Sequence, residues 1–163
     1  DQRTNNYEQS LARIDEVIAS FPDKQILLVD KAVILSDQGQ YLEARLLLEQ
    51  VRRREPNNSY VLYNLVKVAA KLGDTDLAVD LFKEVAYNIP EFSEVYFEIG
   101  KILSGQGKHI DARFYLGNYN LYEGKLNLAE ANFKQVADKT EEQSELGIKS
   151  RELLALIERL KKK

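Results

Sequence analysis

The sequence predicts an all-α protein in which antiparallel helix pairs stack into a solenoid. The first observation is that Pro22, Pro56 and Pro90 lie 34 residues apart, so a unit of that length repeats. The second is that a Gly followed five residues later by an Ala recurs along the chain. These pairs are Gly39/Ala44, Gly73/Ala78, Gly107/Ala112 and Gly124/Ala129. Turn residues at a fixed period are typical of helical repeat arrays.

The second helix of each unit is predicted from two columns in the alignment of the units. A small residue recurs as Ser10, Ala44, Ala78 and Ala112, and four residues later a large one recurs as Ile14, Leu48, Phe82 and Leu116. Residues four positions apart lie on one face of a helix, so the two columns describe a packed helical face. Each proline follows this helix by a few residues, where it blocks further helix.

The first helix of each unit is predicted from an apolar stripe, as in SYVLYNLVKVAAKLG at 59–73. Its apolar residues recur at intervals of three and four, which is the spacing of one helical face. Gly73 stands where that helix would end, because glycine adopts the left-handed conformation of a helix terminus. Ser59 and Ser93 are predicted N-caps, since a serine side chain accepts hydrogen bonds from the free amides of a first turn.

The period and the phased positions resemble the tetratricopeptide repeat, in which large residues, small residues, Gly and Pro occur at fixed places. The resemblance implies a single domain over 1–163 that winds into a right-handed superhelix with a concave groove. The implied segments are 7–20 (second helix of a truncated repeat), 25–58, 59–92 and 93–123 (repeats), 109–140 (an overlapping repeat) and 143–160 (a capping helix). Because the chain opens on a second helix, we expect it to be a piece of a longer protein.

The last two Gly–Ala pairs are only 17 residues apart, which is half of the period. Segment 109–122 fits the second helix of the third repeat, with Ala112 and Leu116 in the small and large columns. It also fits the first helix of a further repeat, which places Gly117 at a small position. One helix is therefore predicted to serve two repeats, and we expect the superhelix to change direction there.

The C-terminal pattern resembles the tetratricopeptide regions of zinc metallopeptidases of the bacterial envelope, such as the barrel-assembly-enhancing protease. The positions that carry it are Gly107, Ala112, Gly117, Gly124 and Ala129, followed by a helix ending in LLALIERL. The HExxH motif of that family's catalytic site is absent from this sequence. The resemblance implies the non-catalytic part of such an enzyme, in the periplasm or cell envelope; otherwise a cytoplasmic location is expected.

Composition argues against several classes of function. A net charge of −3 gives no basic face for nucleic acid, and no apolar stretch approaches the roughly 20 residues of a membrane span. The lone His109, without any Cys, does not suffice for a zinc site, and we interpret it as packing in a turn between helices. No catalytic, cofactor or metal site is expected, so the chain is predicted not to be an enzyme.

The concave groove implied by the repeat resemblance is the candidate binding surface, because the first helices of the repeats line it. Aromatic rings give contact area at low entropy cost, and interleaved charges set the register of a bound peptide. The predicted groove residues are Tyr60, Tyr63, Asn64, Lys67, Lys71, Glu94, Phe97, Glu98, Lys101, Phe114, Asn118 and Tyr122. A clamp for a C-terminal carboxylate is not expected, because Glu94 and Glu98 would repel it.

Two functions are predicted from these features. The first is a non-catalytic module that binds a peptide or partner protein in the groove. The second is a structural or self-assembly element, because the apolar edge of Leu11, Ile14 and Ile18 lacks a covering helix. A second copy, forming a homodimer, or a preceding helix of the parent protein would cover that edge.

Overall fold

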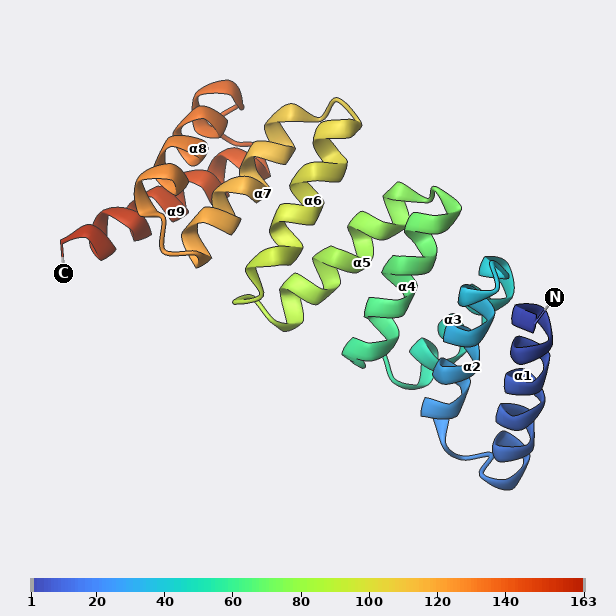
Figure 1. The fold of residues 1–163 in the computed structure, drawn as a ribbon. Helices are drawn as coiled ribbons and strands as arrows, with labels where there is room; N and C mark the ends of the chain where they lie inside the picture. Colours follow the sequence, from blue (N-terminus) through green and yellow to red (C-terminus); the bar gives the residue numbers. More distant parts are fainter. Residues whose placement is uncertain (1, 163) are drawn as a thin grey trace. The chain divides into compact units, whose positions relative to one another are not determined.

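The computed structural model describes residues 2–162, with side chains from residue 6 onward (Figure 1). Nine helices and no strand occur in that part of the chain, so the predicted all-α fold is confirmed. The helices are α1 (Gln2–Ser20), α2 (Gln25–Asp37), α3 (Tyr41–Arg54), α4 (Ser59–Leu72), α5 (Thr75–Asn88), α6 (Ser93–Gly105), α7 (His109–Tyr122), α8 (Leu126–Lys139) and α9 (Glu145–Lys161).

The chain forms two compact units that divide within α5, the first ending at Leu81 and the second beginning at Phe82. In the first unit α2 packs against α1, α3 and α4, and α3 packs against α4. In the second unit α7 packs against α6, α8 and α9, and α8 packs against α9. Consecutive helices therefore lie side by side within each unit, as Figure 1 shows for α2 with α3 and for α6 with α7.

Four glycines make the tight turns that reverse the chain within helix pairs. Gly39, Gly73, Gly107 and Gly124 have φ values between 72° and 80°, in the left-handed region that L side chains rarely adopt. The amide of the residue after each glycine donates to a carbonyl near the end of the preceding helix, at 2.8–2.9 Å. The recurring glycine of the sequence pattern is therefore a helix-terminating residue.

The helix starts differ from the sequence-based expectation at two serines. α4 begins at Ser59, but its N-cap is Asn58, whose Oδ1 accepts a hydrogen bond from the Tyr60 amide at 3.0 Å. Ser93 is likewise the first residue of α6, and its buried hydroxyl donates to Glu123 Oε1 at 2.7 Å. The predicted serine caps are wrong, at Ser59 because the preceding Asn serves as well as Ser in this role and at Ser93 because its hydroxyl has a distant partner.

The core of the first unit lies where α2, α3 and α4 meet. Ala32 of α2 and Ala44 and Leu48 of α3 are completely buried, which places the small and large columns of the sequence pattern inside. An ion pair at the surface also joins α3 to the turn after α4. Arg45 Nη1 of α3 lies 3.1 Å from Asp74 Oδ2, which follows α4. Small residues at the helix crossing let the backbones approach closely.

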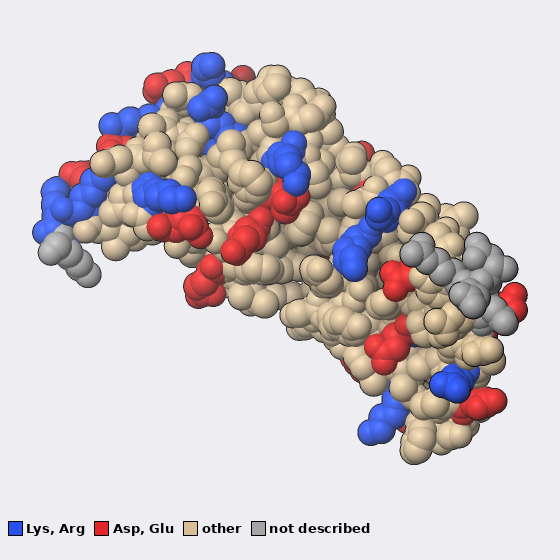
Figure 2. Space-filling view, in the orientation of Figure 1, with Lys and Arg blue, Asp and Glu red and all other residues tan. Residues whose placement is uncertain are grey.

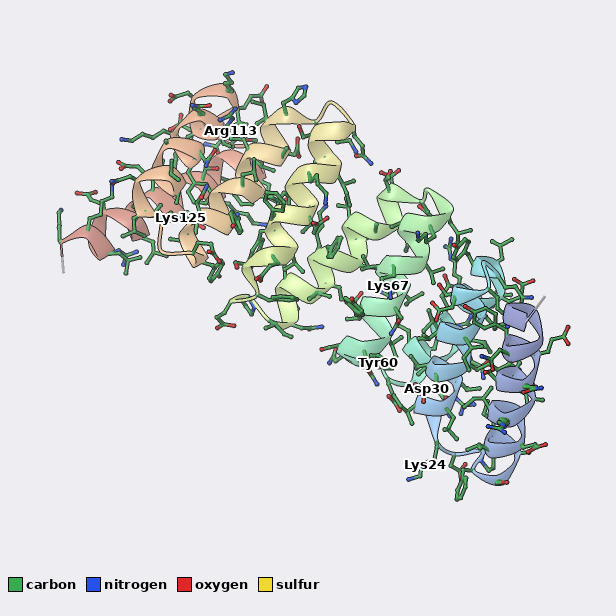
Figure 3. The ribbon with its side chains drawn as sticks, viewed as in Figure 1. Lys24, Asp30, Tyr60, Lys67, Arg113 and Lys125 are labelled. Atoms are coloured by element: carbon green, nitrogen blue, oxygen red, sulfur yellow. The ribbon has the colours of Figure 1, made fainter. Side chains whose placement is uncertain are left out.

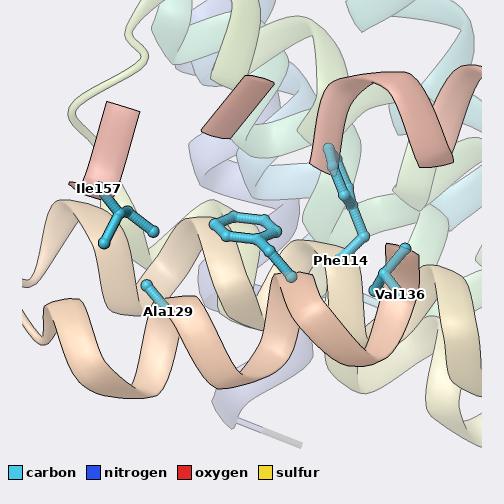
Figure 4. Packing of buried hydrophobic residues seen from close by; sticks show 5 residues of the cluster. Phe114, Ala129, Val136 and Ile157 are labelled. Carbon is cyan, nitrogen blue, oxygen red and sulfur yellow. The ribbon is translucent and has the colours of Figure 1, made fainter. Parts of the chain in front are cut away.

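The core of the second unit forms where α7, α8 and α9 meet (Figure 4). It is a cluster of Phe114, Ala129, Phe133, Val136 and Ile157. The rings of Phe114 and Phe133 lie 5.7 Å apart and meet edge to face, with 63° between their planes. Full burial of a side chain such as Phe133 or Ile157 contributes about 1.5–3 kcal/mol, so this cluster holds α9 on the second unit.

α7 contacts its two neighbours through one glycine at each interface. Gly100 of α6 lies against α7, and a Cβ added there would meet the Ala112 carbonyl and the Leu116 side chain at 3.2 Å. Gly117 of α7 lies against α8, and a Cβ added there would meet the Phe133 ring at 2.6 Å. The contact of α6 with α7 is thus repeated by α7 with α8. α7 acts as the second helix of one pair and as the first helix of the next.

Polar contacts fix both ends of α9. Ser144 is the N-cap, and its Oγ accepts a hydrogen bond from the Gly147 amide at 3.1 Å. Near the other end, Lys161 forms an ion pair with Glu130 of α8, which Lys134 also contacts at 2.8 Å. Hydrogen bonds from Lys134 and Lys161 lower the pKa of Glu130 from 4.5 to about 2.

The contact of Gly117 with Phe133 predicts an unusual response to a small substitution. We expect Gly117→Ala to destabilise the chain by about 1–2 kcal/mol, because overpacking against a buried ring outweighs the helix propensity gained. Gly105→Ala is the matched control, since a Cβ added at this exposed helical glycine meets nothing within 4 Å. Thermal unfolding followed by circular dichroism measures both. A Gly117→Ala variant as stable as Gly105→Ala would contradict the close packing.

The ion pair of Lys161 with Glu130 predicts a pH dependence. The folded pKa of Glu130 is lowered, so the stabilisation is present above the ordinary value of 4.5 and is lost as the pH falls towards 2. We expect Lys161→Met to raise the Glu130 pKa, measured by NMR titration of its carboxyl carbon. Lys139→Met, at the end of α8 and not a partner of Glu130, should leave that pKa unchanged. No change with Lys161→Met would refute the contact.

Candidate functional site

The exposed face of α4 in the first unit presents two aromatic rings beside lysine side chains. Tyr60 and Tyr63 are 42% and 60% exposed, and Lys67 and Lys71 are exposed on the same helix. Tyr60 and Lys67 project from one side of α4 (Figure 3), because residues seven positions apart are separated by almost two full turns. Lys67 Nζ lies 5.5 Å from the centroid of the Tyr63 ring, within cation–π range. We call these four residues the α4 surface.

Asn64 does not share this exposure, contrary to the sequence-based expectation. Its side chain is 6% exposed, and its Nδ2 donates to the Tyr60 carbonyl at 2.8 Å. α4 is buried along more than one face, with Leu62 and Leu65 almost fully enclosed, and Asn64 lies among the buried residues. The side-chain amide of Asn64 is therefore hydrogen-bonded to the backbone of its own helix, and Asn64 is not part of the α4 surface.

The predicted groove residues of α6 lie together on the second unit. Glu94, Phe97 and Lys101 are exposed, and Glu98 is partly exposed. Lys101 Nζ lies 2.6 Å from the Glu98 carboxylate and 6.0 Å from the centroid of the Phe97 ring. Figure 2 shows acidic and basic side chains next to each other over α6. Charge and an aromatic ring thus share one face of this helix.

α7 and the turn after it extend this face with an aromatic ring and a lysine. The rings of Phe97 and Tyr119 lie 5.4 Å apart, and Lys125 Nζ lies 5.2 Å from the Tyr119 centroid. Figure 3 labels Lys125 at the turn between α7 and α8. We define the α6–α7 surface as Glu94, Phe97, Glu98, Lys101, Tyr119 and Lys125.

Tyr119 and Lys125 are not among the groove residues predicted from the sequence. Tyr119 lies three residues after Leu116 of the large column, at the position that holds Val17, Val51 and Val85 in the other units. Residues three positions apart share one face of a helix, so this position is expected on the packed face. A tyrosine in a column of valines is the signal that could have identified the position, because its larger ring reaches past the packed face.

Tyr122, another predicted groove residue, stacks on Tyr96 of α6. The ring centroids lie 5.3 Å apart and the planes are inclined by 4°. Tyr96 is buried whereas Tyr122 is 43% exposed, so one ring of the stack faces solvent. Burial raises the pKa of the Tyr96 hydroxyl well above its usual range, and the neighbouring Tyr122 adds to this shift. Tyr96 therefore stays neutral at physiological pH.

Phe114 and Asn118 do not join the α6–α7 surface, contrary to the sequence-based expectation. Phe114 belongs to the buried cluster with Phe133, and the Nδ2 of the buried Asn118 donates to the Phe114 carbonyl at 2.9 Å. The reason is that α8 and α9 pack over this part of α7 and enclose these side chains. Both residues line a pocket of about 690 Å³ between α5, α7 and α9, with Tyr96 of α6 also in its wall.

The described residues were also compared with the expectations for metal binding, for His109 and for membrane spans. No three His, Cys, Asp or Glu side chains within residues 2–162 are grouped so that they could hold a metal ion. His109 is exposed at the start of α7, so the expectation that it packs in a turn is wrong. No helix in this part of the chain combines the length and the apolar character needed to span a bilayer.

Comparison with known families gives one match, in which residues 35–98 match the sequence model described as tetratricopeptide repeat. A comparison with curated protein sequences gives no significant match.

Solved structures with a similar fold include MamA of Desulfovibrio magneticus RS-1, at 15% identity and a TM-score of 0.63, covering 99% of this chain and 89% of that chain. A tetratricopeptide repeat protein of Parabacteroides merdae ATCC 43184 is 15% identical, with a TM-score of 0.59 over 95% of this chain and 68% of that one. The Yersinia enterocolitica type III secretion translocator chaperone SycD is 17% identical, with a TM-score of 0.51 over 88% and 96%. The chain therefore has the all-helical fold of tetratricopeptide-repeat proteins, and residues 35–98 carry the repeat sequence itself.

Proposed function

We propose that the chain is a non-catalytic protein-interaction module that binds a peptide or partner protein on the first helices of its repeats. The observation that carries this proposal is the pairing of lysine ammonium groups with the exposed rings of Tyr63 and Phe97 and the partly buried ring of Tyr119. Lys67 lies over Tyr63 on the α4 surface, and Lys101 and Lys125 lie over Phe97 and Tyr119 on the α6–α7 surface.

Such pairs suit recognition for two physical reasons. An exposed ring loses little conformational entropy on binding and buries a large apolar area, so aromatic side chains are frequent hot spots. A neighbouring ammonium group attracts the carboxylates of a partner and fixes its register. The tetratricopeptide-repeat fold supports the proposal, because it presents rows of helices as an extended binding face.

The proposed binding residues are a smaller set than the groove residues predicted from the sequence, with two additions. The residues retained are Tyr60, Tyr63, Lys67, Lys71, Glu94, Phe97, Glu98, Lys101 and Tyr122, with Tyr119 and Lys125 added. Asn64, Phe114 and Asn118 are removed because all three are buried, and the amides of Asn64 and Asn118 bond to their own helices. The division into repeats at 25–58, 59–92, 93–123 and 109–140 stays a prediction, as does the winding of 1–163 into one right-handed superhelix.

For the parent protein we propose a zinc metallopeptidase of the bacterial envelope, in which this module would present substrates or dock the enzyme. This proposal is supported by the spacing of Gly107, Ala112, Gly117, Gly124 and Ala129. The proposal that the chain binds a peptide or partner protein does not depend on the identity of the parent protein. A periplasmic location belongs to the same proposal, and a cytoplasmic one is expected without it. An HExxH motif in the parent protein, in the sequence that precedes residue 1 of this chain, would support this assignment.

Self-assembly through α1 is the second candidate function. α1 packs against α2, and Leu11, Ile14 and Ile18 are only partly buried there. The neighbouring Val17 and Phe21 are 39% and 57% exposed. A second copy that covered this edge would make a homodimer. Light scattering over a range of concentrations tests this candidate, since a constant monomer mass would exclude it.

Peptide binding is tested with variants of the two surfaces. Peptides selected from a phage-displayed library on the purified chain are titrated calorimetrically against Tyr63→Ala and Phe97→Ala. We expect at least one of these substitutions to weaken binding about tenfold, because each removes an exposed ring at the centre of its surface.

Leu46→Ala is the matched control, because Leu46 is 66% exposed on α3 and lies outside both surfaces. It should leave the affinity unchanged, and all three variants should unfold at the wild-type temperature. Peptides that bind Tyr63→Ala and Phe97→Ala as tightly as the wild type would overturn the proposed surfaces.

A further inference from the structure

The pocket of about 690 Å³ in the second unit lies outside both surfaces of the proposed function. Its walls come from α5, α7 and α9 and from Tyr96 of α6, whereas the proposed surfaces consist of other side chains on α4, on α6, at the end of α7 and in the turn after it. Phe114, Tyr115 and Asn118 of α7 line it, the first two before Gly117 in the sequence and the third directly after it. We call this pocket the α9 groove.

The walls of the α9 groove are largely aromatic and aliphatic. Tyr87 of α5 is 86% exposed at the groove, and Leu156 of α9 is 37% exposed. Phe114 and Tyr115 meet edge to face at 5.5 Å, which gives the floor a fixed shape. Tyr87 and Leu156 thus leave apolar surface in water within one groove, and a bound apolar side chain would cover it.

The positively charged residues of the groove lie towards its two ends, and the acidic Glu152 lies between them. At the first turn of α9, Glu145 is held by Lys149 at 2.6 Å, and this hydrogen bond lowers the pKa of Glu145, to which the charge of Lys83 adds. One carboxylate thus faces two ammonium groups at this end. At the last turn of α9 stands Arg159, whose Nε donates to the Ala155 carbonyl of its own helix at 3.3 Å. Each end therefore carries an excess of positive charge.

The length of the groove suits an extended peptide. Glu145 and Arg159 lie about 21 Å apart along α9 at 1.5 Å of rise per residue. An extended segment advances about 3.3 Å per residue, so six or seven residues cover this distance. Between the ends, Glu152 also lines the groove, and a carboxylate can accept hydrogen bonds from the backbone amides of a ligand.

We propose that the α9 groove binds a short extended peptide with acidic residues at both ends and bulky apolar residues between them. The acidic ends pair with Lys83 and Lys149 at one end and with Arg159 at the other. The apolar centre packs between Tyr87 and Leu156 over Phe114. This site is independent of the α4 and α6–α7 surfaces.

The test uses fluorescein-labelled octapeptides and fluorescence anisotropy with the full chain. The acidic probe is Glu-Asp-Leu-Phe-Ala-Leu-Asp-Glu, and the matched probe replaces its four acidic residues by lysine. We expect saturable binding of the acidic probe and at least about tenfold weaker binding of the lysine probe, because like charges would meet at both ends.

Variants of residues in the α9 groove test whether the acidic probe binds there. Tyr87→Ala and Arg159→Glu should each weaken binding of the acidic probe by at least about fivefold. Tyr87→Ala removes an exposed ring, and Arg159→Glu reverses the charge at one end of the groove. Leu46→Ala on α3 and Lys162→Glu beyond α9 are the matched controls and should leave the affinity for the acidic probe unchanged. Tyr63→Ala, in the α4 surface, distinguishes that surface from the α9 groove. Tyr87 and Arg159 are exposed, so both variants should unfold at the wild-type temperature.

Three results would overturn the proposal: no saturable binding of the acidic probe, equal binding of the lysine probe, or full affinity in Tyr87→Ala and Arg159→Glu. A loss of affinity with Tyr63→Ala alone would assign the peptide to the α4 surface and reject the α9 groove. Selected peptides that respond to Tyr87→Ala but not to Tyr63→Ala or Phe97→Ala would support this site while rejecting the proposed function.

Discussion

The close approach of α7 to both α6 and α8 is the constraint on which the second unit depends. A helix can belong to two successive pairs only if each interface offers a small residue opposite a large one. Gly100 supplies that small residue against Leu116, and Gly117 supplies it against Phe133. Because the second contact repeats the first after half a period, α7 changes from the second helix of one pair to the first helix of the next.

This change of role decides which side chains are available for binding. Phe114 and Asn118 lie on the part of α7 that α8 and α9 enclose, so they line the α9 groove. Tyr119 and Tyr122, further along the same helix, contact Phe97 and Tyr96 of α6. One helix therefore contributes to two chemically different sites. On the α6–α7 surface, lysine ammonium groups lie over the rings of Phe97 and Tyr119. In the α9 groove, basic side chains lie towards the two ends of a pocket with aromatic walls.

Much of the fold could be predicted from the sequence, because helix formation depends on local patterns. The recurring Gly residues terminate helices as their spacing indicates, and the columns of Ala44 and Leu48 are buried. The double fit of segment 109–122 stays a prediction, in which Ala112 and Leu116 fit the second helix of one repeat and Leu116 and Gly117 fit the first helix of the next. The helix caps were less predictable, because Asn58 and Ser59 are adjacent residues of similar capping strength.

The candidate sites were less predictable, because exposure depends on helices that are distant in the sequence. Asn64 stands at a groove position of its repeat, yet tertiary packing of α4 buries it. Tyr87, Lys83 and Arg159 carry no repeat signature, and the packing of α9 onto α7 brings them to one pocket. Periodicity describes which face of a helix is apolar, but it does not say which later helix will cover a polar or aromatic residue.

The contact between Gly117 and the Phe133 ring is the central claim, and NMR distance measurement tests it most directly. The account predicts strong nuclear Overhauser effects between the Gly117 α-protons and the Phe133 ring protons, with the α-proton shifts displaced by the ring current. Effects from the Phe133 ring to other residues but none to Gly117 would contradict it. α7 would then not be the first helix of a second pair.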